Sequence, residues 1–407
     1  MAIVRAFRGI LYNPKKVNCS DVMSPPYDII SDELKRILYE KSPYNIVRID
    51  CGENSPNLNK YELARKYLSK WLSEDVLIQD ETENLYGYEI DYSYKNKKNV
   101  LRGLVCIVKL EELGKGIYPH EQTYSKPKVD RLSLMKYCMA NTSLIFSLYR
   151  SKERITSKIL EELKEPFIVA TDLDSNIHKL YKISDKKIID EIVRELKDKP
   201  IFIADGHHRY EVALEFREKM NILYPNCKDA PWNYVLMFLT NIEDNGYLIL
   251  PTHRLLITPL RVEEEIKKNQ DMFSLIEFNG SDIEESLENR GPKHIGLYLK
   301  ENKWFILYYK GKPPKHLPDE LGKLDVILVE EIILKLFPKK EVCYETDIEK
   351  SIKFVKEGKC DAVFILRSTK VEEIERVALK GLRMPPKSTY FYPKLLTGMI
   401  INSFNKT

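Results

Sequence analysis

Apolar residues recur along this chain with both the helical and the strand period. Positions 63, 64, 67, 68, 71 and 72 are apolar, which is the spacing of one helix face and predicts a helix over residues 61–72. Ser31, Asp32 and Glu33 are typical of a helix start, since a capping hydroxyl precedes acids in the first turn. Residues 85–94 and 101–110 alternate or run apolar around a polar stretch, which predicts a hairpin. The pattern therefore indicates a mixed α/β (α+β) protein.

The middle of the chain carries a strand–turn–helix pattern. Residues 201–204 form a short apolar run, residues 205–209 are polar, and residues 210–220 have a helical period. The apolar face of that helix consists of Val212, Ala213, Phe216 and Met220. The other elements expected before residue 258 are strands at 3–11, 141–149 and 180–183, a helix at 186–196, a strand pair at 233–240 and 247–250, and a long loop at 114–131.

After about residue 258 the pattern becomes more charged, with strands expected at 294–299, 304–309 and 362–366 and helices at 324–337 and 371–379. We interpret residues 1–258 as one region and residues 259–407 as a second, C-terminal α/β domain. Residues 384–394 are rich in proline and aromatic residues, which would be exposed in a free tail. We therefore expect the final segment to dock back onto the body.

Composition narrows the class of protein. A chain of 407 residues is too long for one ordinary core, so two or three domains are expected. The 65 basic and 61 acidic residues nearly cancel, whereas a nucleic-acid-binding protein usually carries a larger basic excess. No segment approaches the ~20 apolar residues of a membrane span, and arginines interrupt the N-terminus where a signal peptide is apolar. We expect a cytoplasmic protein with small-molecule partners, no nucleic acid and no membrane; its oligomeric state stays open.

The seven cysteines are scattered, and no two are spaced as C-x-x-C. This spacing disfavours zinc ribbons and thioredoxin-type redox pairs. Free thiols in a reducing compartment fit the pattern best. The sequence also lacks the P-loop, Rossmann, HExxH and G-x-S-x-G patterns.

The strongest candidate for chemistry is the DGHHR motif, Asp205-Gly206-His207-His208-Arg209. A strand that ends in a glycine turn and opens a helix directs free backbone N–H groups and the helix dipole to one place. His207, His208 and Arg209 add cationic donors, so an anion such as phosphate is the expected ligand. Asp205 could hold Mg²⁺ or orient a histidine. The structural alternative is that Asp205 caps the helix while the histidines satisfy buried backbone.

Residues 119–123 are the second candidate. Glu121 could act as a general base toward a hydroxyl, with His120 as its tuner or as a phosphate contact, and Thr123 lies beside them. Lys126, Lys128 and Arg131 follow shortly and could clamp phosphate oxygens. A solvated surface turn would explain the same residues.

Weaker candidates pair a cation with a hydroxyl or lie in a rigid turn. His253 and Arg254 follow Thr252, and Lys387, Ser388 and Thr389 follow a Pro-Pro pair. Such pairs suit a phosphate site but are also common on surfaces. Asp28 ends a Pro-Pro-Tyr-Asp turn, which is most simply structural, although its carboxylate could face a pocket.

Several motifs occur in a fixed order over nearly the whole chain and resemble the DUF1015 family. They are Ser24-Pro25-Pro26-Tyr27-Asp28, Ser42-Pro43-Tyr44-Asn45, Pro119-His120-Glu121 with Thr123, the DGHHR motif with Tyr210-Glu211, Pro251-Thr252-His253-Arg254, and Met384-Pro385-Pro386-Lys387-Ser388-Thr389-Tyr390-Phe391.

The DGHHR motif alone is also similar to the phosphate-binding motif of free-serine kinases, which share a ParB/sulfiredoxin-like fold. That resemblance implies Mg²⁺-dependent transfer of a phosphoryl group from ATP, ADP or pyrophosphate to a free amino-acid hydroxyl, with L-serine as the expected acceptor. It implies that His207, His208 and Arg209 hold the phosphate and that Asp205 binds Mg²⁺ or substrate. By the same hypothesis, Gly206, His253, Arg254, Lys387, Ser388 and Thr389 bind the donor, Glu121, Asp205 and His208 are catalytic, and Asp28, His120, Thr123 and Glu211 bind the acceptor.

Three alternatives remain at this point. Glu211 stands behind Glu121 as the base. A ParB-like nucleotide-binding switch would use the same turn without a small-molecule acceptor. A sulfiredoxin-like repair enzyme ranks last, because its chemistry needs a cysteine beside the phosphate turn, where this chain has His207 and His208.

Overall fold

The computed structural model describes residues 3–227, 229–314 and 316–405. The chain is a mixed α/β protein that separates into two compact units. The first unit comprises Met1–Pro119, Thr123–Leu248 and Pro393–Thr407, and the second comprises His120–Gln122 and Ile249–Tyr392. The C-terminal segment thus returns to the first unit. The division predicted between residues 258 and 259 stays a prediction.

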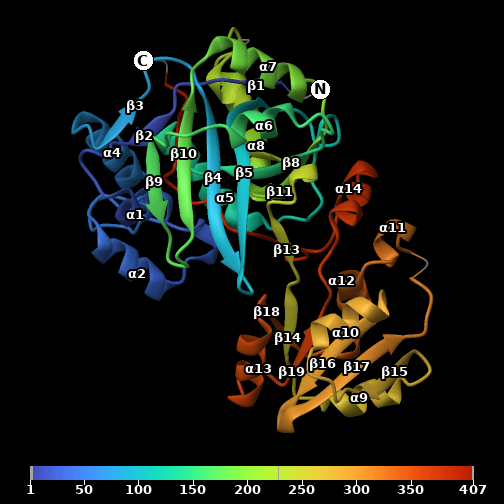
Figure 1. Ribbon diagram of the computed structural model, residues 1–407. Helices are drawn as coiled ribbons and strands as arrows, with labels where there is room; N and C mark the ends of the chain where they lie inside the picture. Colours follow the sequence, from blue (N-terminus) through green and yellow to red (C-terminus); the bar gives the residue numbers. More distant parts are fainter. Residues whose placement is uncertain (1–2, 228, 315, 406–407) are drawn as a thin grey trace. The chain divides into compact units, whose positions relative to one another are not determined.

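The first unit is built on a mixed sheet in the order β6-β11-β8-β12-β5-β4-β10-β9, with β1 paired to β5. Figure 1 shows β9, β10, β4 and β5 side by side, all antiparallel to their neighbours. The β12–β8 and β11–β6 pairs are parallel. The strands of this unit are β1 (Val4–Arg5), β2 (Ile10–Tyr12), β3 (Leu77–Gln79), β4 (Leu85–Tyr94), β5 (Lys97–Lys109), β6 (Ile117–Tyr118), β7 (Ala140–Asn141), β8 (Ile145–Tyr149), β9 (Ile168–Thr171), β10 (Ile177–Ile183), β11 (Ile201–Asp205), β12 (Tyr234–Asn241) and β21 (Asn402–Ser403).

Helices cover this sheet and complete its core. Strand β12 is buried at every position, as its continuous apolar run predicts for a strand covered on both faces. Alternate residues of the sheet pack against helix α8 (His207–Leu223). The predicted apolar face of this helix, Val212, Ala213, Phe216 and Met220, is buried. The helical elements of this unit are α1 (Cys19–Val22), η1 (Tyr27–Ile29), α2 (Asp32–Lys41), α3 (Val47–Asp50), α4 (Lys60–Ser73), α5 (Ser125–Cys138), α6 (Ile155–Glu161), α7 (Lys186–Leu196), α8 (His207–Leu223), η2 (Pro231–Asn233) and η3 (Ile242–Asp244).

Local signals fixed several elements as expected. The Ser31 hydroxyl accepts a hydrogen bond from the Leu34 amide and caps α2. Helix α7 has the predicted bounds, and α4 extends the predicted helix by one residue at each end. The predicted hairpin forms between β4 and β5, with Tyr94 opposite Lys97. All seven cysteines are free thiols.

Two expectations were wrong. Residues 114–131 are not one long loop, because β6 and the first half of α5 lie within them. Pro127 masks the helix signal there, although proline is tolerated in the first turn of a helix. Residues 233–240 and 247–250 do not pair with each other either. Strand β12 pairs with β5 and β8, whereas β13 (Leu248–Leu250) pairs with β20 (Tyr390–Tyr392), a partner far away in sequence.

The second unit has an antiparallel sheet in the order β15-β17-β16-β19-β14-β18. Helices α10 and α13 contribute Leu287 and Val355 to its core. The elements of this unit, besides β13 and β20, are β14 (His253–Ile257), α9 (Val262–Lys268), β15 (Phe273–Glu277), α10 (Ile283–Arg290), β16 (His294–Leu299), η4 (Lys300–Asn302), β17 (Lys303–Tyr309), α11 (Asp319–Gly322), α12 (Asp325–Leu328), η5 (Val329–Ile333), η6 (Leu334–Leu336), β18 (Glu341–Glu345), α13 (Ile348–Lys356), β19 (Ala362–Ile365) and α14 (Val371–Leu379).

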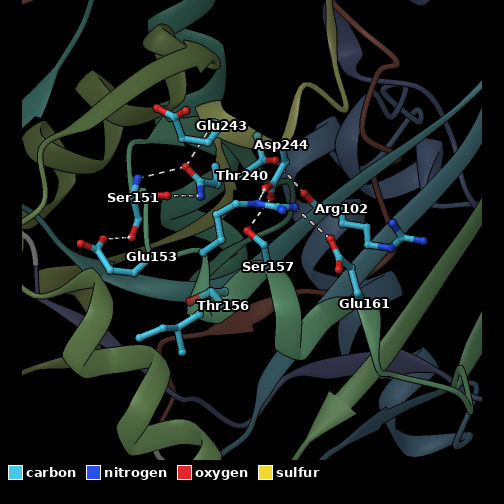
Figure 2. Close-up of polar contacts among 12 residues, drawn as sticks. Arg102, Ser151, Glu153, Thr156, Ser157, Glu161, Thr240, Glu243 and Asp244 are labelled. Atoms are coloured by element: carbon cyan, nitrogen blue, oxygen red, sulfur yellow. Dashed lines mark hydrogen bonds and ion pairs between the residues drawn. The ribbon is translucent and has the colours of Figure 1, made fainter.

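A buried carboxylate organises the start of α6; we call Glu195 and its donors the Glu195 network. Glu195 accepts hydrogen bonds from the Ser151 hydroxyl at 2.7 Å, the Ile155 amide at 2.9 Å, and the Thr156 amide and hydroxyl at 2.6 and 2.5 Å. Figure 2 shows the polar contacts beside this network, where the Ser151 hydroxyl also donates to Glu153 and the Ser157 hydroxyl donates to Asp244. The carboxylate thus satisfies amides that every helix start leaves without an intrahelical partner.

No helix in the described part of the chain is both long and apolar enough to cross a membrane.

Candidate functional site

The DGHHR motif lies at the carboxyl end of β11 and opens α8, a helix of 17 residues. Gly206 is the residue before the helix and has φ of 96°, a conformation that other residues rarely adopt. A Cβ atom there would lie 2.9 Å from Nε of Arg209, so the turn also requires the absence of a side chain. The β11–β8 register shifts between Ile203 and Asp205, and such bulges re-aim a side chain.

Two cations share the Asp205 carboxylate. Lys394 Nζ lies 3.1 Å from Oδ2, and Arg209 Nη2 lies 3.8 Å from Oδ1. Burial alone would raise the pKa of the Asp205 carboxyl, but Lys394 and Arg209 outweigh it and hold that pKa below its ordinary value. Two cations and the positive end of the α8 dipole therefore face this one carboxylate.

The first turn of α8 also holds residues 123–128. His208 Nε2 accepts the Tyr124 amide at 2.8 Å. Glu211 accepts the Thr123 hydroxyl at 2.7 Å and the Lys128 ammonium at 2.5 Å. Because Nε2 of His208 acts as an acceptor, the imidazole is neutral in this arrangement and its Nδ1 carries the proton.

The Pro-rich turn contributes an aromatic ring. Burial raises the pKa of Tyr27 to about 12, and the charges of Arg209, Asp28, Arg131 and Asp205 also act on this phenol. The Arg131 guanidinium lies 4.2 Å from the centroid of the Tyr27 ring. Asp28 itself is exposed in η1. The structure therefore places Tyr27 close enough to the DGHHR motif to be affected by its charges. The sequence had indicated Tyr27 only as part of a structural turn.

Arg131 has other partners. Its guanidinium is buried and forms ion pairs with Asp50 at 3.0 Å and Asp130 at 2.5 Å. Two carboxylates therefore balance this cation, and a role as a phosphate clamp is not needed to explain its burial.

In the second unit, residues 120–121 meet residues 387–389. His120 is fully buried, and its Nε2 lies 2.9 Å from the Thr389 hydroxyl. The two Glu121 carboxylate oxygens accept the backbone amides of Lys387 and Ser388 at 2.9 and 3.2 Å. The sequence had predicted both groups separately, and the structure pairs them.

His253 and Arg254 have different partners in the same unit. His253 Nδ1 accepts the Leu366 amide at 3.3 Å. Arg254 is 0% exposed, and its Nε lies 3.0 Å from Glu330. A fully buried guanidinium with a carboxylate partner is explained by packing, and the part of Arg254 in donor binding stays a prediction.

A family comparison agrees with these motifs. The model of the family described as "Protein of unknown function (DUF1015)" matches residues 4–327. The chain belongs to the DUF1015 family. No curated protein matches this DUF1015 chain.

Solved structures give distant likenesses to the DUF1015 chain. A mutant free serine kinase in complex with AMP is 15% identical, with 70% of this chain and 87% of that chain covered and a TM-score of 0.40. A conserved hypothetical protein from Pyrococcus furiosus is 16% identical, with 70% and 90% covered and a TM-score of 0.38. C-terminally truncated SbnI from Staphylococcus aureus is 13% identical, with 72% and 85% covered and a TM-score of 0.37. Because every TM-score is below 0.5, these likenesses assign no activity to this chain.

Sequence reasoning missed Lys394 as a site residue of this DUF1015 chain. The only signal was its place at the end of the aromatic C-terminal motif, where a lysine follows Pro393. Its ion pair joins residues 189 positions apart, and no local pattern encodes such a contact.

Proposed function

We propose that this DUF1015 chain is a phosphotransferase that moves a phosphoryl group from ATP, ADP or pyrophosphate to the hydroxyl of a free amino acid, with L-serine as the first candidate. The observation that carries the proposal is the DGHHR turn. A glycine with positive φ opens α8, and Lys394 and Arg209 bring two cations to the same place. Phosphoryl transfer needs chiefly positioning and charge stabilisation, which such a turn supplies.

We assign the phosphate-binding role to the hydrogen-bond donors of the DGHHR motif. Backbone amides of the first α8 turn, with His207, His208 and Arg209, would contact the transferred phosphate. His208 would use Nδ1–H, because its Nε2 accepts the Tyr124 amide. We also keep the ParB/sulfiredoxin-like fold as a proposal for the region around the motif.

Asp205 is the residue that would hold Mg²⁺. In the described part of the chain, no three His, Cys, Asp or Glu side chains gather as a metal site. The Asp205 carboxylate already faces Lys394 and Arg209, so Mg²⁺ would fit here only together with the donor phosphates, which supply further oxygen ligands and negative charge. When bound, the ion would neutralise charge on the donor phosphates.

Glu121 remains the proposed base. Its carboxylate is oriented by two backbone amides, and orientation is the first requirement of a general base. Glu211 is the weaker candidate because the Thr123 hydroxyl and the Lys128 ammonium already occupy its carboxylate. His120 would bind the amino-acid acceptor, and Lys387, Ser388 and Thr389 would bind the phosphoryl donor.

The test is a phosphorus-31 NMR assay of the purified full-length protein with Mg²⁺ and L-serine, offering ATP, ADP and pyrophosphate separately. We expect a new phosphomonoester signal with one of these donors. Replacing Glu121 by Gln is expected to abolish the product while donor binding persists, with Glu211→Gln as the matched variant. Nucleotide binding without any product would contradict the proposal and favour a regulatory nucleotide-binding switch.

A further inference from the structure

Lys394 is placed to meet an anion at the DGHHR turn. Its side chain is 14% exposed, and Nζ lies 3.1 Å from Asp205 Oδ2. A lysine ammonium has three donors on a flexible stem, so it can turn one N–H toward a ligand while another stays on the carboxylate.

Arg209 is less free to do this. Its Nη1 donates to the carbonyl oxygen of Leu144, and its guanidinium fills the space that a side chain at position 206 would take. Moving this guanidinium would disturb the turn itself. Arg209 is therefore part of the turn, whereas Lys394 reaches the Asp205 carboxylate from a segment 189 positions away.

A buried chain of hydrogen bonds holds the backbone beside Lys394. The Leu396 amide donates to the Tyr88 hydroxyl oxygen at 3.2 Å, and this hydroxyl lies 2.8 Å from Nδ1 of His178. Nε2 of His178 lies 3.1 Å from the Asp172 carboxylate. Tyr88 and His178 are 1% and 0% exposed. We call these four residues the Leu396 relay.

Both ring nitrogens of His178 are engaged in the Leu396 relay. Nδ1 lies on the Tyr88 hydroxyl, and Nε2 lies on the Asp172 carboxylate. Every group in the relay has a partner, and a fully satisfied buried network rigidifies its surroundings.

The Leu396 relay holds the backbone two residues after Lys394, at the Leu396 amide. Thr397 adds a second anchor, because it exchanges backbone hydrogen bonds with Ser24 at 2.8 and 3.2 Å. The short segment 394–397 is thus fixed at its far end by Tyr88 and Ser24, while its near end carries the ammonium group on Asp205. These contacts set the backbone position from which the Lys394 side chain reaches the turn.

We propose that Lys394 is a substrate-binding residue that contacts a phosphate of the phosphoryl donor, and that Tyr88, His178 and Asp172 are positioning residues that act on it through Leu396. This inference rests on the proposed phosphotransferase function. The donor phosphate would share the ammonium group with Asp205, without a change in the covalent structure of the protein.

The test is calorimetric titration of the full-length protein with inorganic pyrophosphate and Mg²⁺. Lys394→Met is expected to raise the Kd about tenfold or more, since it removes a charge-assisted hydrogen bond. Lys394→Arg keeps the charge and is expected to bind more tightly than Lys394→Met. Lys182→Met is the control, because Lys182 also pairs with a carboxylate of the first unit, that of Asp80 at 2.5 Å.

Tyr88→Phe separates positioning from general stability. Tyr86 lies two residues earlier on β4, and its hydroxyl also accepts a buried backbone amide, that of Gly9 at 2.9 Å. Both substitutions remove one hydroxyl, but only Tyr88→Phe is expected to weaken pyrophosphate binding, by about threefold to tenfold. In a Lys394→Met background, Tyr88→Phe is expected to change the Kd no further, because it acts through that lysine.

The outcomes distinguish this inference from the proposed function. A wild-type protein that binds neither pyrophosphate, ATP nor ADP overturns both. Wild-type binding that Lys394→Met leaves unchanged overturns the inference alone. Equal effects of Tyr86→Phe and Tyr88→Phe on binding, or full additivity of Tyr88→Phe with Lys394→Met, overturn the positioning role of the relay.

Discussion

Two carboxylates of the first unit lie beside the start of a helix, and they are balanced in different ways. Glu195 accepts only neutral donors, two hydroxyls and two amides at the start of α6. Asp205, before α8, faces the cations Lys394 and Arg209. Burial would raise the pKa of both carboxyls. The hydroxyls and amides lower the pKa of Glu195, and the cations lower that of Asp205.

This difference suggests a structural role for Glu195 and a ligand-binding role for the turn at Asp205. In the Glu195 network, each of the four donors already has the carboxylate as its partner. All four donors are neutral, so no cation is present in this network to bind an added anion. The Asp205 carboxylate instead faces two cations, and it is at this turn that we propose phosphate binding. We therefore expect changes at Glu195 to lower stability and changes at the turn to lower phosphate binding.

The largest expected effect is on stability. Glu195→Ala would remove the acceptor of the Ile155 and Thr156 amides and of the Thr156 hydroxyl, and we expect a loss of about 3 kcal/mol in the free energy of unfolding. Denaturant unfolding measures this value, with the exposed Glu191→Ala on the same helix as control. Pyrophosphate binding of the folded variant should be unchanged. A loss of binding equal to that of a turn variant would erase the distinction between the two carboxylates.

The next effect combines binding with a smaller loss of stability. Gly206→Ala places a Cβ 2.9 Å from Arg209 at a φ of 96°, so we expect about 2 kcal/mol of destabilisation. Pyrophosphate binding should fall at least as much as in Lys394→Met, because the turn itself is displaced. Gly114→Ala is the matched control, since Gly114 has φ of 89° but no atom within 4 Å of the added Cβ. Should both variants bind pyrophosphate equally, the geometry of the turn would not matter for the ligand.

The smallest effect is in the pH dependence of stability. The folded-state pKa of Glu195 lies below the unfolded value of about 4.3, so its contribution is present above the unfolded pKa and is lost as the pH falls through the folded pKa. Glu195→Gln should lack this pH-dependent contribution. As the pH falls below about 5, the free energy of unfolding of Glu195→Gln should therefore decrease less than that of the wild type. Parallel stability curves for the two proteins would contradict the lowered pKa.

Much of the local structure was predictable because its causes are local. The Ser31 cap, the bounds of α7 and the β4–β5 hairpin follow from residues close in sequence. The predicted loop over residues 114–131 was wrong, since a proline in the first turn concealed α5. The pairing of β13 with β20 was missed because strand partners are chosen by tertiary packing and not by sequence separation.

The candidate site divides in the same way. The sequence by itself determined that a strand–glycine–helix turn forms at residues 205–209, because an apolar run, a glycine and a helical period suffice for that geometry. Only the tertiary structure decided that Lys394 pairs with Asp205, which amide donates to Glu121, which hydroxyl lies on His120, and which hydrogen bond anchors Leu396. Each of these contacts joins residues more than 180 positions apart. The physical reason is that hydrogen bonds and ion pairs depend on distances of about 3 Å, which the folding of the whole unit sets and no short stretch of sequence specifies.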